Sequence, residues 1–114
     1  MTPARSVAAD VSDVSDVFAA LADPNRRAIY ESLLGGTAVS ATILARGSTI
    51  SRQAIVKHLQ VLEAAGLAVS KRRGREVVYG PAATGIANLN TWLATTAGRW
   101  ERRVAKLAAM STRG

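Results

Sequence analysis

Residues 51–65 read SRQAIVKHLQVLEAA and show the spacing of an amphipathic helix. Four apolar residues recur at intervals of one helical turn and therefore share one face. They are Ala54, Ile55, Leu59 and Leu62. Ser51 is a good N-terminal cap, and Gly66, directly after the stretch, is a common helix terminator. The pattern predicts a helix over residues 51–65 whose apolar face packs into a core.

The opposite face of this predicted helix is polar and basic. It carries Arg52, Gln53, Val56, Lys57 and Gln60. Arginine can form a bidentate pair with guanine, glutamine can pair with adenine, and valine can touch a thymine methyl group. The N-terminus of a helix also offers free N–H groups to a phosphate. The face therefore suits a DNA major groove, although an ordinary helix with a solvated face would show the same pattern.

Three shorter helices are expected earlier in the chain. They cover about residues 12–22, 24–34 and 41–46. Asp23 can cap the second of them, Pro24 suits its first position, and Gly35-Gly36 ends it. A short extended link over residues 37–39 precedes the third helix, and a turn over residues 47–50 follows it. The third helix, this turn and the next helix form a predicted helix-turn-helix.

A basic β-hairpin is expected next. Its strands should cover residues 67–71 and 76–79, with the turn at Gly74. The cations around this turn are Lys71, Arg72, Arg73 and Arg75. Such a tip can lie along a DNA backbone or enter a minor groove. The alternative is an edge hairpin whose charges protect it against aggregation.

Pro81 ends the hairpin, and a last helix is predicted over about residues 82–110, weakened near Gly85 and Gly98. Apolar residues recur along it at helical spacing, which suits pairing with another helix. Together with the first helix they predict the interface of a homodimer. The expected interface residues are Val14, Phe18, Leu89, Trp92, Leu93, Trp100, Val104 and Leu107. The two tryptophans could instead line a ligand pocket.

The charge distribution favours a polyanionic partner. Residues 1–50 carry four basic and five acidic side chains, whereas residues 51–114 carry eleven basic and three acidic ones. The length of 114 residues suggests one domain. We expect this domain over residues 11–110, between tails at 1–10 and 111–114.

Several classes of protein are disfavoured by what the sequence lacks. The chain contains no cysteine, one histidine and eight carboxylates, and it has no glycine-rich phosphate loop, so we expect no enzyme and no cofactor. His58 without cysteine or a nearby acidic cluster cannot hold a metal ion within one chain, and a helix-packing or phosphate-contacting role is expected for it. The apolar runs are too short to span a membrane, and the first residues lack a signal-peptide core. A cytoplasmic protein is therefore expected.

The predicted order of elements is that of a winged helix-turn-helix: mainly α, with a small β-hairpin as the wing. In detail, FAALADPNRRAI at 18–29 resembles the first signature of the ArsR family. Residues 51–67, with KHL at 57–59 and AGL at 65–67, resemble its recognition helix, and Gly74-Arg75 with Tyr79 resemble its wing. The last helix, with its two tryptophans, is similar to a metal-independent branch of that family.

The resemblance implies a homodimer that binds operator DNA, usually as a repressor. The residues expected at double-stranded DNA are Ser51, Arg52, Gln53, Val56, Lys57, His58 and Gln60 in the recognition helix, with the four cations of the wing. Because the third helix has no cysteine and the last helix no histidine or aspartate, the family's usual metal and thiol sensing is not expected, and the effector stays open. The alternatives are a winged-helix protein-interaction module and a nonspecific, chromosome-coating DNA binder.

Overall fold

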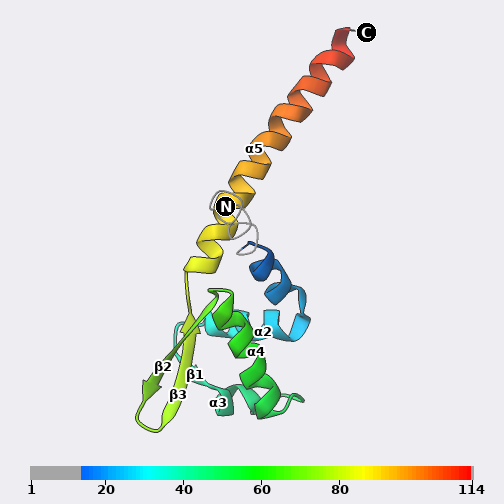
Figure 1. Ribbon diagram of the computed structural model, residues 1–114. Helices are drawn as coiled ribbons and strands as arrows, with labels where there is room; N and C mark the ends of the chain where they lie inside the picture. The colour runs from blue at the N-terminus through cyan, green and yellow to red at the C-terminus, as the bar shows by residue number, and fades with distance from the viewer. Residues whose placement is uncertain (1–13, 114) are drawn as a thin grey trace, which may run out of the picture.

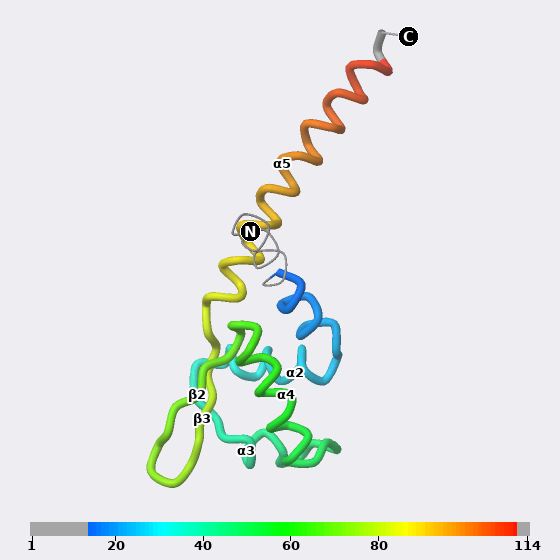
Figure 2. Tube along the Cα trace, viewed as in Figure 1, coloured from blue at the N-terminus to red at the C-terminus, as the bar shows by residue number. Residues whose placement is uncertain are grey.

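Short helices and a small sheet form one end of the molecule, and a long helix extends away from them (Figures 1 and 2). The computed structural model describes residues 14–113. The helices are α2 (Pro24–Leu33), α3 (Ala41–Ala45), α4 (Arg52–Ala64) and α5 (Thr84–Arg113), preceded by an N-terminal helical segment over 14–22. The strands are β1 (Val39–Ser40), β2 (Ala68–Arg73) and β3 (Glu76–Pro81). The prediction of a mainly helical winged helix-turn-helix is confirmed.

Each of the three helices in the body begins at a capping side chain. Asp23 accepts hydrogen bonds from the backbone N–H groups of Asn25 and Arg26, at 2.8 and 3.1 Å. Ser40 caps α3 and Ser51 caps α4 in the same way: each hydroxyl oxygen accepts a hydrogen bond from the backbone N–H three residues later, that of Ile43 and that of Ala54. The N–H of Arg26 is the main reason why the pKa of Asp23 lies below its usual value. The helix starts are therefore fixed locally by the sequence.

The core lies where α4 packs between α2 and the sheet. Its largest fully buried side chains are Val17, Leu33, Ile55, Leu59, Leu62 and Leu67. Three of the four residues predicted to form the apolar face of α4 are buried, and the fourth, Ala54, is half-buried. The core thus holds α4 by one face and leaves the opposite face available.

The sheet is antiparallel, with strand order β1-β3-β2. Val39 pairs with Tyr79, and the hairpin register pairs Arg73 with Glu76 across a turn of Gly74 and Arg75. Gly74 has a φ of 63°, which favours glycine. Both hairpin strands run two residues further than predicted, so two arginines assigned to the loop belong to β2. Charged side chains on an exposed hairpin hide the apolar alternation that marks a strand.

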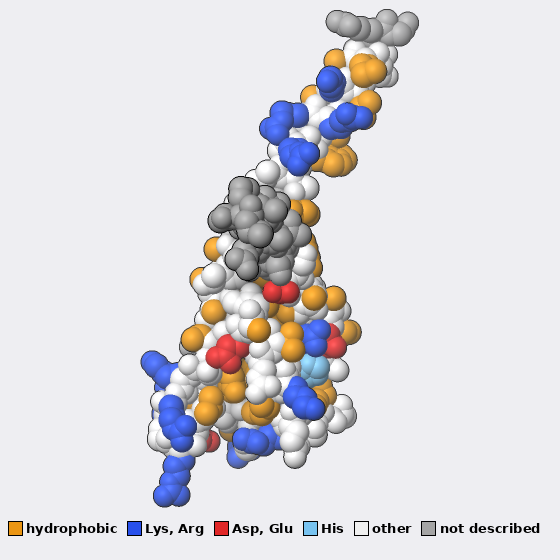
Figure 3. All heavy atoms as spheres, in the orientation of Figure 1, with side chains coloured by type: hydrophobic (Ala, Val, Ile, Leu, Met, Phe, Trp, Pro, Cys, Tyr) orange, Lys and Arg blue, Asp and Glu red, His pale blue; other side chains and the backbone are white. Residues whose placement is uncertain are grey.

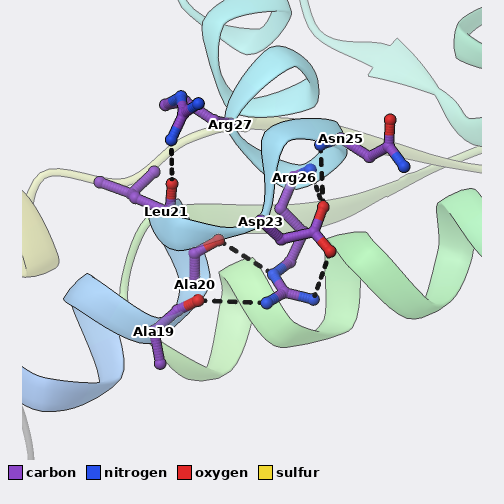
Figure 4. A network of polar contacts seen from close by, with 7 residues as sticks. All are labelled: Ala19, Ala20, Leu21, Asp23, Asn25, Arg26 and Arg27. Atoms are coloured by element: carbon purple, nitrogen blue, oxygen red, sulfur yellow. Dashed lines mark hydrogen bonds and ion pairs between the residues drawn. The ribbon is translucent and has the colours of Figure 1, made fainter.

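Two neighbouring arginines join the N-terminal helical segment to α2 (Figure 4). Arg26 donates from Nε to the carbonyl of Ala20 at 2.9 Å and from Nη2 to that of Ala19 at 3.1 Å. Arg27 donates from Nη1 to the carbonyl of Leu21 at 2.8 Å. These guanidinium groups satisfy carbonyls at a helix end that has no further turn to bond them. The expected start of this helix at Ser12 and the tail at 1–10 lie outside the described residues.

The backbone of α5 crosses the end of α4 at two glycines. The N–H of Gly85 donates to the carbonyl of Gly66 at 2.8 Å. A Cβ atom on Gly85 would lie 2.6 Å from the carbonyl oxygen of Ala65, too close for any side chain. The last helix runs unbroken through Gly85 and Gly98, and the expectation that these glycines weaken it stays a prediction. Gly85 allows a close approach of two backbones.

Candidate nucleic-acid interface

The polar face of α4 is open to solvent in this chain. Ser51, Arg52, Gln53, Lys57 and Gln60 are exposed. Gln53, Lys57 and Gln60 lie on the side of the helix opposite its buried leucines, whereas Arg52 is exposed at the N-terminal end of α4, on the side that faces α3. They belong to the first two and a half turns of the helix, where the uncompensated backbone N–H groups also lie. This arrangement presents hydrogen-bonding side chains and positive charge on one surface, as a major-groove reader requires.

Two of the residues assigned to this face are placed differently. Val56 is half-buried and packs against the hydrophobic core, so only part of its side chain faces outward. His58 is half-buried as well, and it lies close enough to Asp23 to contribute to the lowered pKa of that carboxyl. Both residues lie at the boundary between the two faces of α4, where the helical pattern of the sequence does not predict whether a side chain is buried or exposed.

Arg52 makes a contact that the sequence did not indicate. Its Nε donates a hydrogen bond of 3.1 Å to Oγ1 of Thr42, an exposed residue in the first turn of α3. The two residues are ten positions apart, on the two helices of the helix-turn-helix. Thr42 thus joins the surface formed by α4, although no motif in the sequence singled it out.

The hairpin of β2 and β3 supplies the second group of cations. Lys71, Arg72, Arg73 and Arg75 are all exposed, and Figure 3 shows Lys and Arg side chains at the tip of the hairpin. At the base of the hairpin, Ser70 donates a hydrogen bond of 2.7 Å to a carboxylate oxygen of Glu63 near the end of α4. This bond ties the wing to the helix whose polar face is exposed, so both can act on one ligand.

The helix α5 exposes the apolar residues expected at a dimer interface. Phe18 and Trp92 pack edge to face, with ring centroids 5.4 Å apart and an interplanar angle of 84°. Val14 and Leu89 are half-buried. The remaining members, Leu93, Trp100, Val104 and Leu107, are exposed, and Trp100 is 68% exposed. Leu93, Trp100, Val104 and Leu107 therefore leave apolar surface exposed along α5, whereas Val14 and Leu89 are partly covered within this chain.

The two tryptophans do not come together in one pocket. Trp92 contacts Phe18, whereas Trp100 lies eight residues further along α5, about 12 Å along the helix axis. Across residues 14–113, no cluster of three or more histidine, cysteine or acidic side chains could hold a metal ion. In the same part of the chain, no helix has the length and apolar character needed to cross a membrane.

Comparison with known proteins matches this fold to DNA-binding regulators. The helix-turn-helix domain model matches residues 21–70. Over 72 residues the chain is 43% identical to the HTH-type transcriptional regulator Rv2034 of Mycobacterium tuberculosis. The aligned region covers 63% of this chain and 66% of Rv2034, so the chain spans just under two thirds of the length of that relative. The chain is 31% identical to the transcriptional repressor SdpR of Bacillus subtilis, over 70% of this chain and 88% of the repressor.

Solved structures show the same relationship. An ArsR-like transcriptional regulator from Rhodococcus sp. RHA1 superposes with a TM-score of 0.78 at 36% identity, covering 88% of this chain and 93% of that one. The homodimeric winged helix-turn-helix DNA-binding domain Mb0332 of Mycobacterium bovis superposes with a TM-score of 0.64 at 26% identity, covering 80% and 83%. The chain belongs to the ArsR-type family of helix-turn-helix transcriptional regulators.

Proposed function

We propose that this regulator reads specific double-stranded DNA sequences with the exposed face of α4. The observation that carries the proposal is the exposure of Arg52, Gln53 and Lys57 in the N-terminal half of a helix whose apolar face packs in the core. Arginine and glutamine supply the hydrogen-bonding patterns that distinguish guanine and adenine in the major groove. Ser51, Val56, His58 and Gln60 of the same helix are proposed to add contacts to base edges or phosphates.

The wing is proposed to bind the DNA backbone rather than to read sequence. Its four cations project from a narrow hairpin that Ser70 and Glu63 fasten to α4. Contacts between arginine or lysine and phosphate carry no sequence information and release counterions. Substitution of Arg73 should therefore weaken binding to all duplexes alike and reduce its salt dependence, whereas substitution of Arg52 or Gln53 should relax sequence preference.

Two copies are proposed to bind one operator. The apolar stripe on α5 is uncovered in a single chain, and the related Mycobacterium bovis domain is homodimeric. A two-fold dimer would present its two α4 helices to successive major grooves, about 34 Å apart. The operator should then be an imperfect inverted repeat. A regulator of chromosomal genes in a bacterium would act in the cytoplasm, which is the proposed location.

Repression is the proposed outcome of operator binding. The related Bacillus subtilis protein is a transcriptional repressor. A dimer seated across two grooves would block the access of polymerase to an overlapping promoter. A reporter gene placed behind the selected operator should rise in expression when the regulator is removed, and a fall in expression would identify an activator instead.

Selection of bound fragments from genomic DNA with the full chain tests the proposal. We expect enrichment of an inverted repeat, and footprinting should protect both of its halves. Arg52→Ala should weaken binding to the enriched site by about 1–3 kcal/mol. Arg103→Ala removes the same charge from an exposed position on α5 and serves as the matched control, with unchanged preference.

Three results would contradict the proposal. Equal affinity for the enriched site and for bulk DNA would identify a nonspecific chromosome-coating protein. Protection of a single asymmetric half-site would contradict the dimer. If the wild type binds no DNA and instead binds a protein partner through α4, the protein-interaction module is favoured.

A further inference from the structure

The side chain of Arg52 is fastened at one of its two hydrogen-bonding edges. A guanidinium group is planar and offers a side edge, made of Nε and one Nη, and an outer edge, made of Nη1 and Nη2. The side edge is occupied because Nε donates to Oγ1 of Thr42. Within residues 14–113, Nη1 and Nη2 of Arg52 have no hydrogen-bond or ion-pair partner. The free edge is therefore the outer one.

We propose that Thr42 is a positioning residue that turns the outer edge of Arg52 toward a guanine in the bound operator. The inference rests on the proposed function, because it concerns how α4 reads its DNA. Guanine presents O6 and N7 side by side in the major groove, and two donors in one plane match them. With Nε bound to Thr42, Nη1 and Nη2 are the pair that remains for this contact.

The backbones of both Thr42 and Arg52 are fixed at capped helix starts. Thr42 lies in the first turn of α3, which the side chain of Ser40 caps through the N–H of Ile43 at 3.2 Å. Arg52 is the first residue of α4, directly after the capping residue Ser51. Threonine is branched at Cβ, so its hydroxyl has few orientations available. The long arginine side chain is the mobile partner, and Thr42 restricts it before DNA arrives.

This restriction should appear as sequence preference. An unrestrained arginine loses side-chain freedom when it binds a base, which reduces affinity for each immobilised side chain. Pre-orientation by Thr42 removes part of that loss only where the outer edge meets its acceptors, so the gain is confined to duplexes with guanine at that position. We expect Thr42→Val, which keeps the shape and removes the hydroxyl, to lower the preference for guanine about 3- to 10-fold. Thr42→Ser should keep most of the preference.

The test measures dissociation constants for pairs of duplexes. The guanine contacted by Arg52 is the operator position whose preference disappears in Arg52→Ala. The full-length wild type and the Thr42→Val, Thr42→Ser and Arg52→Ala variants are compared on the selected duplex and on the duplex with adenine at that position. Thr42→Val added to Arg52→Ala should change the preference by less than about twofold, because the residue acts through the arginine.

A second measurement follows the hydrogen bond without DNA. The Nε–H proton of Arg52 should exchange slowly with solvent in the wild type and in Thr42→Ser, and faster in Thr42→Val, when followed by ¹⁵N-edited NMR. This readout does not depend on the operator, and a substitution that only altered the stability of α3 would not change it selectively.

The outcomes separate the inference from the proposed function. If the wild type shows no sequence preference, the proposed function fails and the inference fails with it. If the wild type selects a site and Thr42→Val keeps the full preference, only the inference is overturned. It is also overturned if Thr42→Val weakens all duplexes equally and independently of Arg52→Ala, since that pattern identifies a direct phosphate contact.

Discussion

Apolar side chains are buried in the body of the molecule but exposed along the outer part of α5. In the body, residues 24–81, the leucines and isoleucines of α2 and α4 are buried against one another. Along α5 from residue 90 to residue 111, every residue is exposed except Gly98, and the apolar ones form a stripe. The body is thus held by contacts within one chain, whereas α5 displays a surface that lacks a cover within residues 14–113. Contiguous exposed apolar surface of this kind marks an interaction site.

Deletion of core atoms should have the largest effect and should separate the two regions most clearly. Leu59 is fully buried in the middle of α4. Leu59→Ala should lower the free energy of unfolding by about 2–5 kcal/mol, because it removes apolar contacts and leaves a cavity. Urea denaturation at concentrations where the protein is monomeric measures this loss of unfolding free energy. Leu107→Ala on the exposed stripe is the matched control, and an equal loss at concentrations where the protein is monomeric would refute the contrast between the regions.

The next largest loss of unfolding free energy is expected at the crossing of α5 and the end of α4, where the two regions meet. Gly85→Ala would place a Cβ atom 2.6 Å from the carbonyl oxygen of Ala65. Because both atoms belong to backbones that cannot move independently, we expect a loss of about 1–3 kcal/mol in thermal or urea unfolding. Gly98→Ala meets only the flexible end of Arg102, at 3.5 Å, and should be neutral or stabilising by up to about 1 kcal/mol. Equal effects of the two substitutions would show that the crossing does not matter.

Association of two chains should depend on the stripe rather than on the body. Trp100 is the most exposed large apolar residue of α5. Trp100→Ala should raise the dissociation constant of the dimer at least about tenfold, while unfolding of the monomer is unaffected. Sedimentation equilibrium over a range of concentrations measures this. An intact dimer of unchanged affinity would remove Trp100 from the interface.

The smallest expected effect is a pH dependence at the start of α2. The pKa of Asp23 is lowered in the folded protein, so its charged form stabilises the fold above the unfolded-state pKa of about 3.9, and this contribution is lost as the pH falls through the folded-state pKa. Asp23→Asn keeps a capping oxygen but does not titrate. The difference in melting temperature between wild type and Asp23→Asn should shrink or reverse below about pH 4. A constant difference across the range would contradict this role.

The sequence predicted the parts of the fold that depend on local patterns. The apolar face of α4 follows from helical spacing, and the caps at Asp23 and Ser51 follow from residue type, since both effects act within a few residues. The basic hairpin was recognised from Gly74 and its flanking cations. The strand β2 extends further than predicted because its charged end does not alternate with apolar residues, and β3 extends through Gly80 and Pro81, two residue types that are rare inside strands.

The features that the sequence did not reveal depend on contacts between distant segments. Thr42 and Arg52 meet only because α3 and α4 pack at a particular angle, and neither residue type indicates the other. Gly85 accommodates the backbone of Gly66 from a segment nineteen residues earlier, a contact that the residue type alone did not indicate. Val56 adjoins the boundary of two helix faces, where a small rotation decides burial. The roles of the individual residues at DNA and at the dimer interface stay predictions.

The glycine crossing has a mechanical consequence for a protein that reads two sites at once. The hydrogen bond between Gly85 and Gly66 joins α5 to the end of α4 backbone to backbone, with no side chain between them to absorb movement. The thirteen residues of α4 place its reading end about 20 Å from this joint. In a pair of chains joined along α5, a tilt of about 10° at the joint therefore moves the reading end by about 3 Å, close to the rise of one base pair. In the proposed dimer, a change in the tilt of α5 alone would therefore shift the two α4 helices out of register with successive major grooves.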